Sequence, residues 1–229
     1  MKIRLSSYNL HKCRGMTGPH APERNLAVIR DVGADVVALQ EVDFRFGARP
    51  EALPRNLIAE ATGLVPAPHL GTSDQSLGWH GQTILIRPDL AEVARVRRLP
   101  LPGIEPRGAL ALVLPGITII AVHLGLARSS RRAQLARLTA KAARIGGQAV
   151  AVTGDFNEWH DDRGLESLDG LHVIAPGPSW PAPFPQLRYD RIAISPSLQV
   201  SASGVFDTPL ARKASDHLPI WADLEPRSE

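Results

Sequence analysis

Six apolar segments of the sequence end in, or lie next to, a side chain that can bind a metal ion or move a proton. One such residue at the end of a strand means little, because turns and helix caps use Asp and Asn freely. Six segments with this feature are harder to explain by turn chemistry, so we expect their ends to meet at one site. The side chains are Asn9, Glu41, His123, Asp155 with Asn157, Asp190, and Asp216 with His217.

Carboxylates that converge in this way need a cation. Like charges at close range raise one another's pKa and destabilise the fold unless a positive charge neutralises them. Carboxylate and amide oxygens are hard ligands, which favours Mg²⁺, with Mn²⁺ as a substitute. Zinc would need several His or Cys ligands at compact spacing. His11 and Cys13 are close in the sequence, but nothing nearby completes such a set.

The other polar residues fit phosphoester hydrolysis. Mg²⁺ held by few carboxylates usually works on phosphate oxygens and neutralises charge on the phosphorus centre and the leaving oxygen. Asn157 can present its amide to the phosphate or to the attacking water. A histidine paired with a carboxylate, such as His217 with Asp190, can orient and deprotonate water. His123 can donate to a phosphate oxygen or to the leaving group, and the guanidinium of Arg107 can clamp two phosphate oxygens.

The elements that position these residues are read from period-two alternation, short apolar runs and helical periodicity. Helices are expected from about Pro22 to Gly33, from about Pro50 to Thr62 and from Ser130 to Ile145. Strand runs are interrupted by single helices once in each half of the chain, which indicates two sheets, each with helices on its outer face. Strands are expected at 2–9, 35–41, 82–87, 109–114, 117–123, 149–154, 188–194 and 218–224, with a weaker one near 90–97.

Length and composition narrow the class of protein. We expect the 229 residues, 1–229, to form a single domain, and the oligomeric state to be monomeric. The sequence contains no run of about 18 apolar residues, so we expect no membrane-spanning segment. The N-terminus lacks the apolar core of a signal peptide, which favours a cytoplasmic location. Cys13 is the only cysteine, so no internal disulfide can form. A formal net charge of +3 gives a weak field, unlike the basic surface of a dedicated DNA binder.

The segments that carry these residues resemble the endonuclease/exonuclease/phosphatase superfamily, the DNase I-like proteins. They occur in the family's order and extend from residue 6 to residue 221, and the sequence looks most like short stand-alone bacterial members described as metal-dependent hydrolases. The segments are SYNLHKCRGM, LQEV, AVHLGL, TGDFNEW, YDRI and SDHLPI.

The resemblance implies a fold and a set of roles. The fold is an α/β four-layer αββα sandwich, with two packed, mainly antiparallel sheets, outer helices and a site at one edge between the sheets. Glu41 would be the main metal ligand, with Asn9 and Asp216 beside it. The implied catalytic residues are His123 on the phosphate, Asp155 and Asn157 on the nucleophilic water and the phosphate, and Asp190 with His217 as the acid–base pair, while either Asp155 or His217 is the general base.

Three functions stay open at this stage. The first is a phosphodiesterase or phosphatase acting on a small-molecule or lipid head-group phosphoester. The second is a DNA or RNA endonuclease or exonuclease, whose binding would weaken steeply with salt. The third is a non-catalytic binding module on the same fold. Trp79, Trp159 and Trp180 fall in long loops, where they would either line a substrate pocket, stack a base or pack the loops, and His80 is close enough to a strand start to reach the site.

Overall fold

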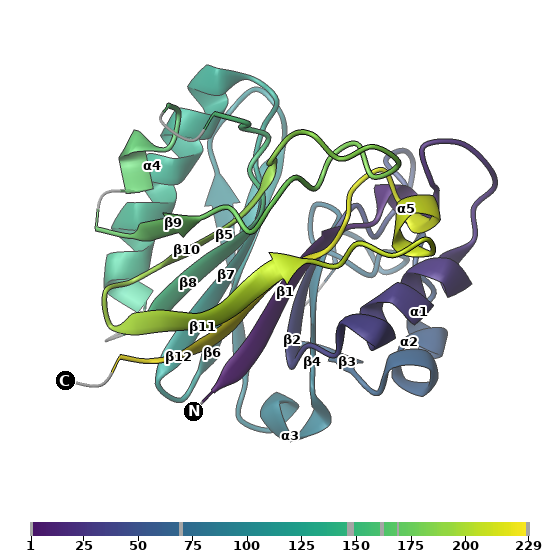
Figure 1. Ribbon diagram of the computed structural model, residues 1–229, viewed down its shortest axis with the longest axis horizontal. Helices are drawn as coiled ribbons and strands as arrows, with labels where there is room; N and C mark the ends of the chain where they lie inside the picture. Colours follow the sequence, from purple (N-terminus) through teal and green to yellow (C-terminus); the bar gives the residue numbers. More distant parts are fainter. Residues whose placement is uncertain (1, 69–70, 146–148, 161–162, 169, 228–229) are drawn as a thin grey trace.

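A computed structural model describes residues 2–68, 71–145, 149–160, 163–168 and 170–227. Within these residues, twelve strands form two sheets of six, which pack face to face (Figure 1). The first sheet has the order β11 (Leu198–Val205), β12 (Ile220–Pro226), β1 (Ile3–Asn9), β2 (Val36–Gln40), β4 (Gln82–Ile86) and β3 (Val65–Pro66). The second has the order β5 (Arg95–Leu101), β6 (Arg107–Leu114), β7 (Ile117–His123), β8 (Val150–Asp155), β10 (Asp190–Ile194) and β9 (His172–Ile174).

Strand pairing brings the polar strand ends to one edge. β1 and β2 are parallel, as are β7 and β8, and the other neighbouring strands are antiparallel. In the second sheet, His123 faces Asp155 across the parallel pair, and Asp190 faces Asp155 across the antiparallel pair. In the first sheet, Asn9 faces Gln40, the residue before Glu41. Because parallel strands end at the same edge of a sheet, each sheet delivers its polar residues to one side.

The two sheets enclose an apolar interior. Inward-facing side chains such as Leu5 and Ile84 from the first sheet and Leu112 and Ile119 from the second are fully buried and belong to one cluster. Burying a side chain of this size stabilises the folded state by roughly 1.5–3 kcal/mol. The apolar interior therefore holds the sheets together and fixes the relative positions of the polar strand ends at its edge.

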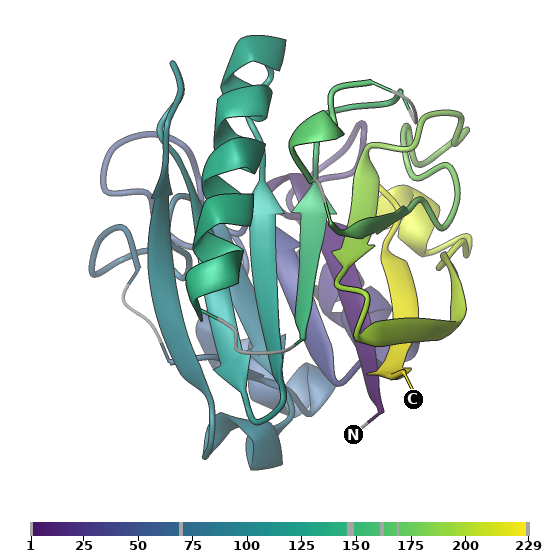
Figure 2. The ribbon, with the colours of Figure 1, turned by 90° about the vertical axis from the view of Figure 1, so that its left-hand side faces the viewer.

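Helices cover the outer face of each sheet, as the two views show (Figures 1 and 2). On the first sheet lie α1 (Pro22–Val32), α2 (Arg55–Thr62) and the short α5 (Ala211–Ala214), and on the second lies α4 (Arg128–Ile145). Leu135, Leu138 and Ala142 of α4 are buried against β6, β7 and β8. None of the described helices combines the length and apolarity needed to cross a bilayer. The layer order confirms the expected αββα sandwich.

Most of the expected elements are present. The eight main strands predicted from the sequence all form, with ends within two residues of the expected ones, as do the helices that begin near Pro22 and Ser130. The helix expected from Pro50 was wrong at its start: Glu51 pairs with Asp43 in a bridge, and the helix begins after Pro54. The weak strand near 90–97 was also displaced, because the short helix α3 (Pro88–Ala91) precedes β5. The edge strand β11 and the two short strands β3 and β9 were missed.

One glycine is required where β7 and β8 meet the site. Gly154, next to Asp155, has φ +152°, and a Cβ added there would lie 1.9 Å from the carbonyl oxygen of Val122. Gly116, in the turn between β6 and β7, has φ +83° but open space around its Cβ position. Alanine at Gly154 would therefore meet both steric overlap and backbone strain, whereas alanine at Gly116 would meet backbone strain alone.

We expect Gly154→Ala to lower the free energy of unfolding by about 3 kcal/mol or more, because strain and overlap add. Gly116→Ala is the matched control and should cost about 1–2 kcal/mol from the left-handed backbone alone. Urea denaturation followed by circular dichroism measures both. Equal losses for the two variants would show that the backbone at Val122 yields freely.

Candidate active site

The site lies where the two sheets meet at the polar edge. The side-chain amide of Asn9, at the end of β1, donates from Nδ2 to Oδ2 of Asp155 at 3.1 Å. This hydrogen bond joins the first sheet to the second. Both residues are buried. Two of the strand-end residues expected to converge are thus in direct contact, although 146 positions separate them in the sequence.

A chain of three buried ionisable groups forms the centre of the site. Nδ1 of His217 lies 2.8 Å from Oδ2 of Asp190, and Nε2 of His217 lies 3.7 Å from Oδ2 of Asp155. Ser179 donates its hydroxyl to the same Asp190 oxygen at 2.5 Å. Because a carboxylate can only accept, the short contact places a proton on Nδ1 of His217. Asp190 therefore fixes the orientation of the imidazole, and the opposite nitrogen faces Asp155.

Burial and charge shift the pKa values of this chain in different directions. Burial alone would lower the pKa of His217, but Asp190 and Asp155 outweigh it and raise that pKa to about 10. Burial raises the pKa of Asp155, although the neighbouring His217 cation opposes this rise. At neutral pH the imidazolium of His217 therefore lies between two carboxylates.

His123 approaches the same carboxylate from β7. Its Nε2 lies 3.5 Å from Oδ2 of Asp155, and the side chain is buried. Burial lowers the pKa of His123 to about 3, and the positive charge of Arg107 acts in the same direction. The ring is therefore neutral at physiological pH, with one nitrogen able to donate and the other able to accept.

The three expected metal ligands surround the turn η1 (His11–Cys13), which follows β1. The backbone N–H of His11 donates to Oδ1 of Asn9 at 3.0 Å, and Nδ1 of His11 lies 3.9 Å from Oδ1 of Asp216. Ser215 donates its hydroxyl to the backbone carbonyl of Asn9 at 2.6 Å, which ties the segment carrying Asp216 to the end of β1. Asn9 and Asp216 are thus held at the same turn.

Glu41 is paired with an ammonium group. Its Oε2 contacts Nζ of Lys12, and both side chains are about three-quarters buried. Burial alone would raise the pKa of Glu41, but His123 in its protonated form and Lys12 outweigh it and lower the pKa to about 2. The carboxylate is therefore ionised, and Lys12 supplies the positive charge that it needs.

The three expected ligands can be compared with what Mg²⁺ requires. Across the described residues, no group of three or more His, Cys, Asp and Glu side chains is arranged as a metal site. The expected ligands are the carboxylates of Glu41 and Asp216 and the amide of Asn9. An asparagine is not among these four residue types, so a group of this kind could not contain all three ligands. Their oxygens are the hard ligands that Mg²⁺ takes. Glu41 is ionised and lies beside these donors, so the residues fit the ion in chemical type.

Backbone strain is concentrated at the same place. His11, Lys12 and Cys13 have φ values of +46°, +57° and +56°, Glu41 has +55° and Asn157 has +52°. Residues other than glycine rarely adopt this left-handed region, and each instance costs of the order of 1–3 kcal/mol unless the surroundings fix it. Such strain gathers at functional sites because the side chains must be aimed there.

The remaining expected residues lie at the rim. Asn157 donates its side-chain amide to the carbonyl of Leu124 at 2.9 Å, and its backbone N–H donates to Oδ1 of Asp155 at 2.8 Å. Arg107, at the start of β6, lines a small hollow together with Glu41 and His123 and donates to Glu105 at 2.8 Å. All the candidate residues named from the sequence thus lie at one edge of the molecule.

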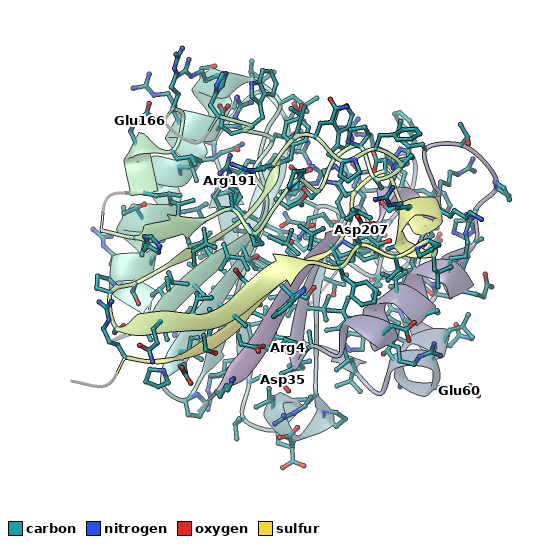
Figure 3. All side chains as sticks on the ribbon, viewed as in Figure 1. Arg4, Asp35, Glu60, Glu166, Arg191 and Asp207 are labelled. Atoms are coloured by element: carbon teal, nitrogen blue, oxygen red, sulfur yellow. The ribbon has the colours of Figure 1, made fainter. Side chains whose placement is uncertain are left out.

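Buried arginines support the segment that carries Asn157. Arg191, labelled in Figure 3, is almost fully buried and donates to the backbone carbonyls of Glu158 and His160, at 3.2 Å each. Arg131 of α4 holds the carboxylate of Glu158 at 2.8 Å. These contacts fix the residues that follow Asp155, and nothing in their sequence context distinguished them from surface arginines.

The loop tryptophans divide between the two roles considered from the sequence. Trp79 is buried in the apolar interior, where it packs over Gly108, so it is a packing residue. Trp159 is half exposed, and its ring centroid lies 6.0 Å from that of Tyr189. The ring centroid of Trp180 lies 5.3 Å from that of Tyr189, which in turn lies 6.2 Å from the ring centroid of His217. Trp159, Tyr189 and Trp180 thus form an aromatic row that reaches the site.

Sequence analysis missed Lys12, Ser179 and Tyr189. Lys12 could have been found, because it lies within the SYNLHK segment next to His11. Ser179 lies in a proline-rich loop, and no local pattern marks it.

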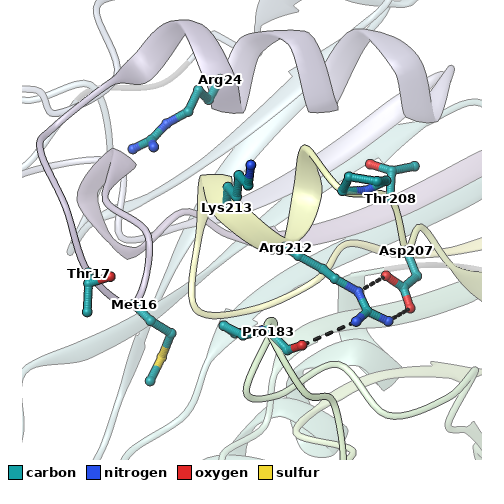
Figure 4. A pocket seen from close by; sticks show the side chains of 9 residues that line it. Met16, Thr17, Arg24, Pro183, Asp207, Thr208, Arg212 and Lys213 are labelled. Carbon is teal, nitrogen blue, oxygen red and sulfur yellow. Dashed lines mark hydrogen bonds and ion pairs between the residues drawn. The ribbon is translucent and has the colours of Figure 1, made fainter.

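Another, larger hollow lies away from the candidate site (Figure 4). It measures about 780 Å³ and is bordered by Met16, Arg24 and Lys213 among others, and by none of the candidate site residues. Arg212 on its wall is held by both carboxylate oxygens of Asp207, at 2.6 and 2.7 Å. This hollow is therefore separate from the candidate active site.

The pKa of His217 gives a direct test of the geometry. In the metal-free protein we expect its imidazole to stay protonated through about pH 8, because the raised pKa is near 10. Asp190→Asn should lower this pKa by about one to three units, the usual effect of removing an adjacent opposite charge. In the unsubstituted protein, the His217–Asp190 ion pair contributes fully to stability below the ordinary histidine pKa, and this contribution is lost as the pH rises through the raised pKa.

Nitrogen-15 NMR of the imidazole measures the titration. Asp223→Asn makes the same chemical change at a carboxylate that pairs with Arg4 and should leave His217 unaffected. A His217 that titrates near 6.5 in the unsubstituted protein would contradict the arrangement.

Comparison with known proteins identifies relatives along the whole chain. A model described as the Endonuclease/Exonuclease/phosphatase family matches residues 6–217. The chain is 32% identical over 249 residues to the uncharacterized protein YbhP of Escherichia coli strain K12, an alignment covering 97% of this chain and 96% of that protein.

Two solved structures share the fold. The endonuclease/exonuclease/phosphatase of Beutenbergia cavernae has a TM-score of 0.71 at 21% identity, covering 98% of this chain and 72% of that one. A mannosyl-6-phosphatase of Bacteroides thetaiotaomicron has a TM-score of 0.72 at 18% identity, covering 97% of this chain and 99% of that one. Since the family model and a relative of similar length both match most of the sequence, the chain belongs to the endonuclease/exonuclease/phosphatase family.

Proposed function

We propose that this protein is a divalent-metal-dependent phosphoester hydrolase, a phosphodiesterase or phosphatase that uses Mg²⁺, with Mn²⁺ as a substitute. The observation that carries the proposal is the buried chain Asp155–His217–Asp190 at the same edge as the hard donors Asn9, Glu41 and Asp216. Two carboxylates flanking one imidazolium, with further acids close by, are costly to bury, and such groups are concentrated at functional sites.

Glu41, Asn9 and Asp216 would hold the metal ion. When bound, such an ion neutralises charge on the phosphate and on the leaving oxygen. In the metal-free protein Lys12 supplies the opposing charge at Glu41. Because Lys12 contacts Oε2 of Glu41, its ammonium would compete with the ion for this oxygen.

The protonation states support a division of roles between the other residues. His217 is already protonated at neutral pH, so it is suited to donate a hydrogen bond to the developing negative charge. Asp155, whose pKa is raised by burial, is the better candidate to accept the proton of the attacking water. Asp190 orients His217 through its Nδ1 hydrogen bond. The neutral ring of His123, the amide of Asn157 and the guanidinium of Arg107 would contact the phosphate.

One structural neighbour is named as a mannosyl-6-phosphatase. From this name we take for the proposal only the kind of bond cleaved, a phosphoester. A nuclease is the second candidate, and one observation favours it. Tyr189, which contacts both Trp159 and Trp180, lies beside His217, and such rings can stack on a nucleobase. The formal net charge of +3 gives little support for gripping a long polyanion.

The first test is hydrolysis across a substrate panel with Mg²⁺, Mn²⁺ or EDTA. The panel contains bis-p-nitrophenyl phosphate, inositol phosphates, phospholipid head-group esters, RNA, plasmid DNA and an abasic duplex. Metal-dependent cleavage of any member supports the proposal. Steep loss of cleavage with salt on the nucleic acids alone would favour the nuclease.

We expect Glu41→Ala to abolish the metal-dependent activity, because the ion loses its main carboxylate, while the fold is kept. Glu60→Ala, on the surface of α2, is the matched control and should retain full activity. Circular dichroism confirms folding of both variants. Activity of Glu41→Ala close to that of the unsubstituted protein would remove Glu41 from the site.

A second prediction concerns the affinity for the metal. Lys12→Gln removes the cation that competes for Glu41, so Mn²⁺ should bind about fivefold more tightly, as expected for a partly exposed ion pair of roughly 1 kcal/mol. Isothermal titration calorimetry measures the dissociation constant. Lys141→Gln, on α4, is the charge-matched control. Weaker Mn²⁺ binding by Lys12→Gln would show instead that Lys12 assists the ion.

A further inference from the structure

A second hollow borders the proposed active site. It measures about 120 Å³, and Glu41 and His123 form part of its wall. Its other wall carries Arg45, Arg49 and Arg107, with His80 between them in the lining. We call this space the arginine pocket and define it by Arg45, Arg49, His80 and Arg107.

The arginines of this pocket have few partners. The side chain of Arg107 is only 9% exposed, it makes one ion pair with Glu105 at 2.8 Å, and its Nε is buried without a hydrogen-bond partner. Arg45 reaches the same Glu105 oxygen only at 3.9 Å. The guanidinium of Arg49 has no hydrogen bond or ion pair with any described residue. Arg45 and Arg107 therefore share one carboxylate, and Arg49 has none among the described residues.

The other acids of the lining are already engaged. Asp43 is buried and accepts backbone N–H groups of Leu77 and Gly78 at 2.7 and 3.0 Å. Glu41 contacts Lys12, and the proposed function assigns it to the metal ion. With Lys12, the lining carries four cationic side chains against three carboxylates, so its positive charge exceeds its negative charge by one.

The state of His80 agrees with this excess. Burial lowers the pKa of His80, and the charges of Arg49, Arg107 and Arg98 lower it further. Its Nδ1 is buried and lacks a partner. A neutral imidazole beside several guanidiniums can donate to an anion without adding another charge.

The size of the pocket limits what it can hold. Water occupies about 30 Å³ per molecule in the liquid, so the pocket has room for about four groups of that size. A phosphate or a carboxylate fits this space. Guanidinium groups bind both anions through paired hydrogen bonds.

We propose that the arginine pocket binds a second anionic group of the substrate, a phosphate or a carboxylate placed close to the ester that is cleaved. The inference rests on the proposed function and specifies its substrate class as a compact phosphoester with two anionic groups. Arg49 is the best residue to substitute, because its guanidinium makes no hydrogen bond or ion pair with a described residue and its removal would break no such contact.

Kinetics on matched esters test the inference. The substrates are p-nitrophenyl phosphodiesters whose second ester group is glycerol, glycerol phosphate or glycerate. The unsubstituted protein should show a KM about tenfold lower for one or both of the doubly charged esters than for the glycerol ester, and the better of the two identifies phosphate or carboxylate. Arg49→Gln should remove this difference while keeping kcat/KM for the glycerol ester within about twofold. Arg24→Gln, in the larger hollow, should change neither value.

A binding experiment keeps the inference testable apart from catalysis. Inorganic phosphate added to the metal-free protein should shift the imidazole NMR signals of His80, and Arg49→Gln should weaken this binding about tenfold. If all three esters are hydrolysed with equal KM by both proteins, the proposed function holds and the pocket inference is wrong. If no ester is hydrolysed, the proposed function fails, and phosphate binding that Arg49→Gln leaves unchanged overturns the pocket as well.

Discussion

The structure depends on burying like charges where two sheets meet. Asp155 and Asp190 are almost completely removed from water, and the imidazolium of His217 lies between them. Breaking such a buried group of charges by removing one member costs several kcal/mol, because the others are left uncompensated. Asn9 extends the arrangement into the first sheet through Asp155. Correct docking of the two sheets is therefore a condition for satisfying these charges, and the apolar interior between the sheets provides that docking.

The same edge also carries local strain, and the two features have a common explanation. Left-handed residues follow β1 at His11, Lys12 and Cys13, follow β2 at Glu41, and follow β8 at Asn157. A strand that simply continued would alternate its side chains between faces. A left-handed residue directly after the strand turns the chain, so that successive polar side chains remain near the same centre. The stability supplied by the buried strands is sufficient to hold these conformations.

The sequence predicted the strands and the site for one physical reason. Buried strands read as apolar runs, and a polar residue at the end of such a run is visible without a structure, as at Glu41 and Asp155. What could not be predicted depends on tertiary contact. The edge strand β11 alternates small and polar residues, and its pairing with β12 decides its conformation. Ser179 contacts Asp190 only because a proline-rich loop folds back over the site. The pairing of Lys12 with Glu41 likewise needed the left-handed turn.

Net charge was the least informative sequence property, because charge acts locally. An excess of three positive charges over 229 residues indicates no particular ligand. Many arginines are neutralised where they lie, as Arg212 is by Asp207 and Arg4 by Asp223. The arginines around the small hollow beside Glu41 differ, because Arg45 and Arg107 share one carboxylate, Glu105, and Arg49 has none among the described residues. At distances of a few ångströms and with little water between, such an imbalance outweighs the average field of the molecule. The anion binding proposed beside the site therefore depends on these few guanidiniums, and the net charge of the whole chain gives no guide to it.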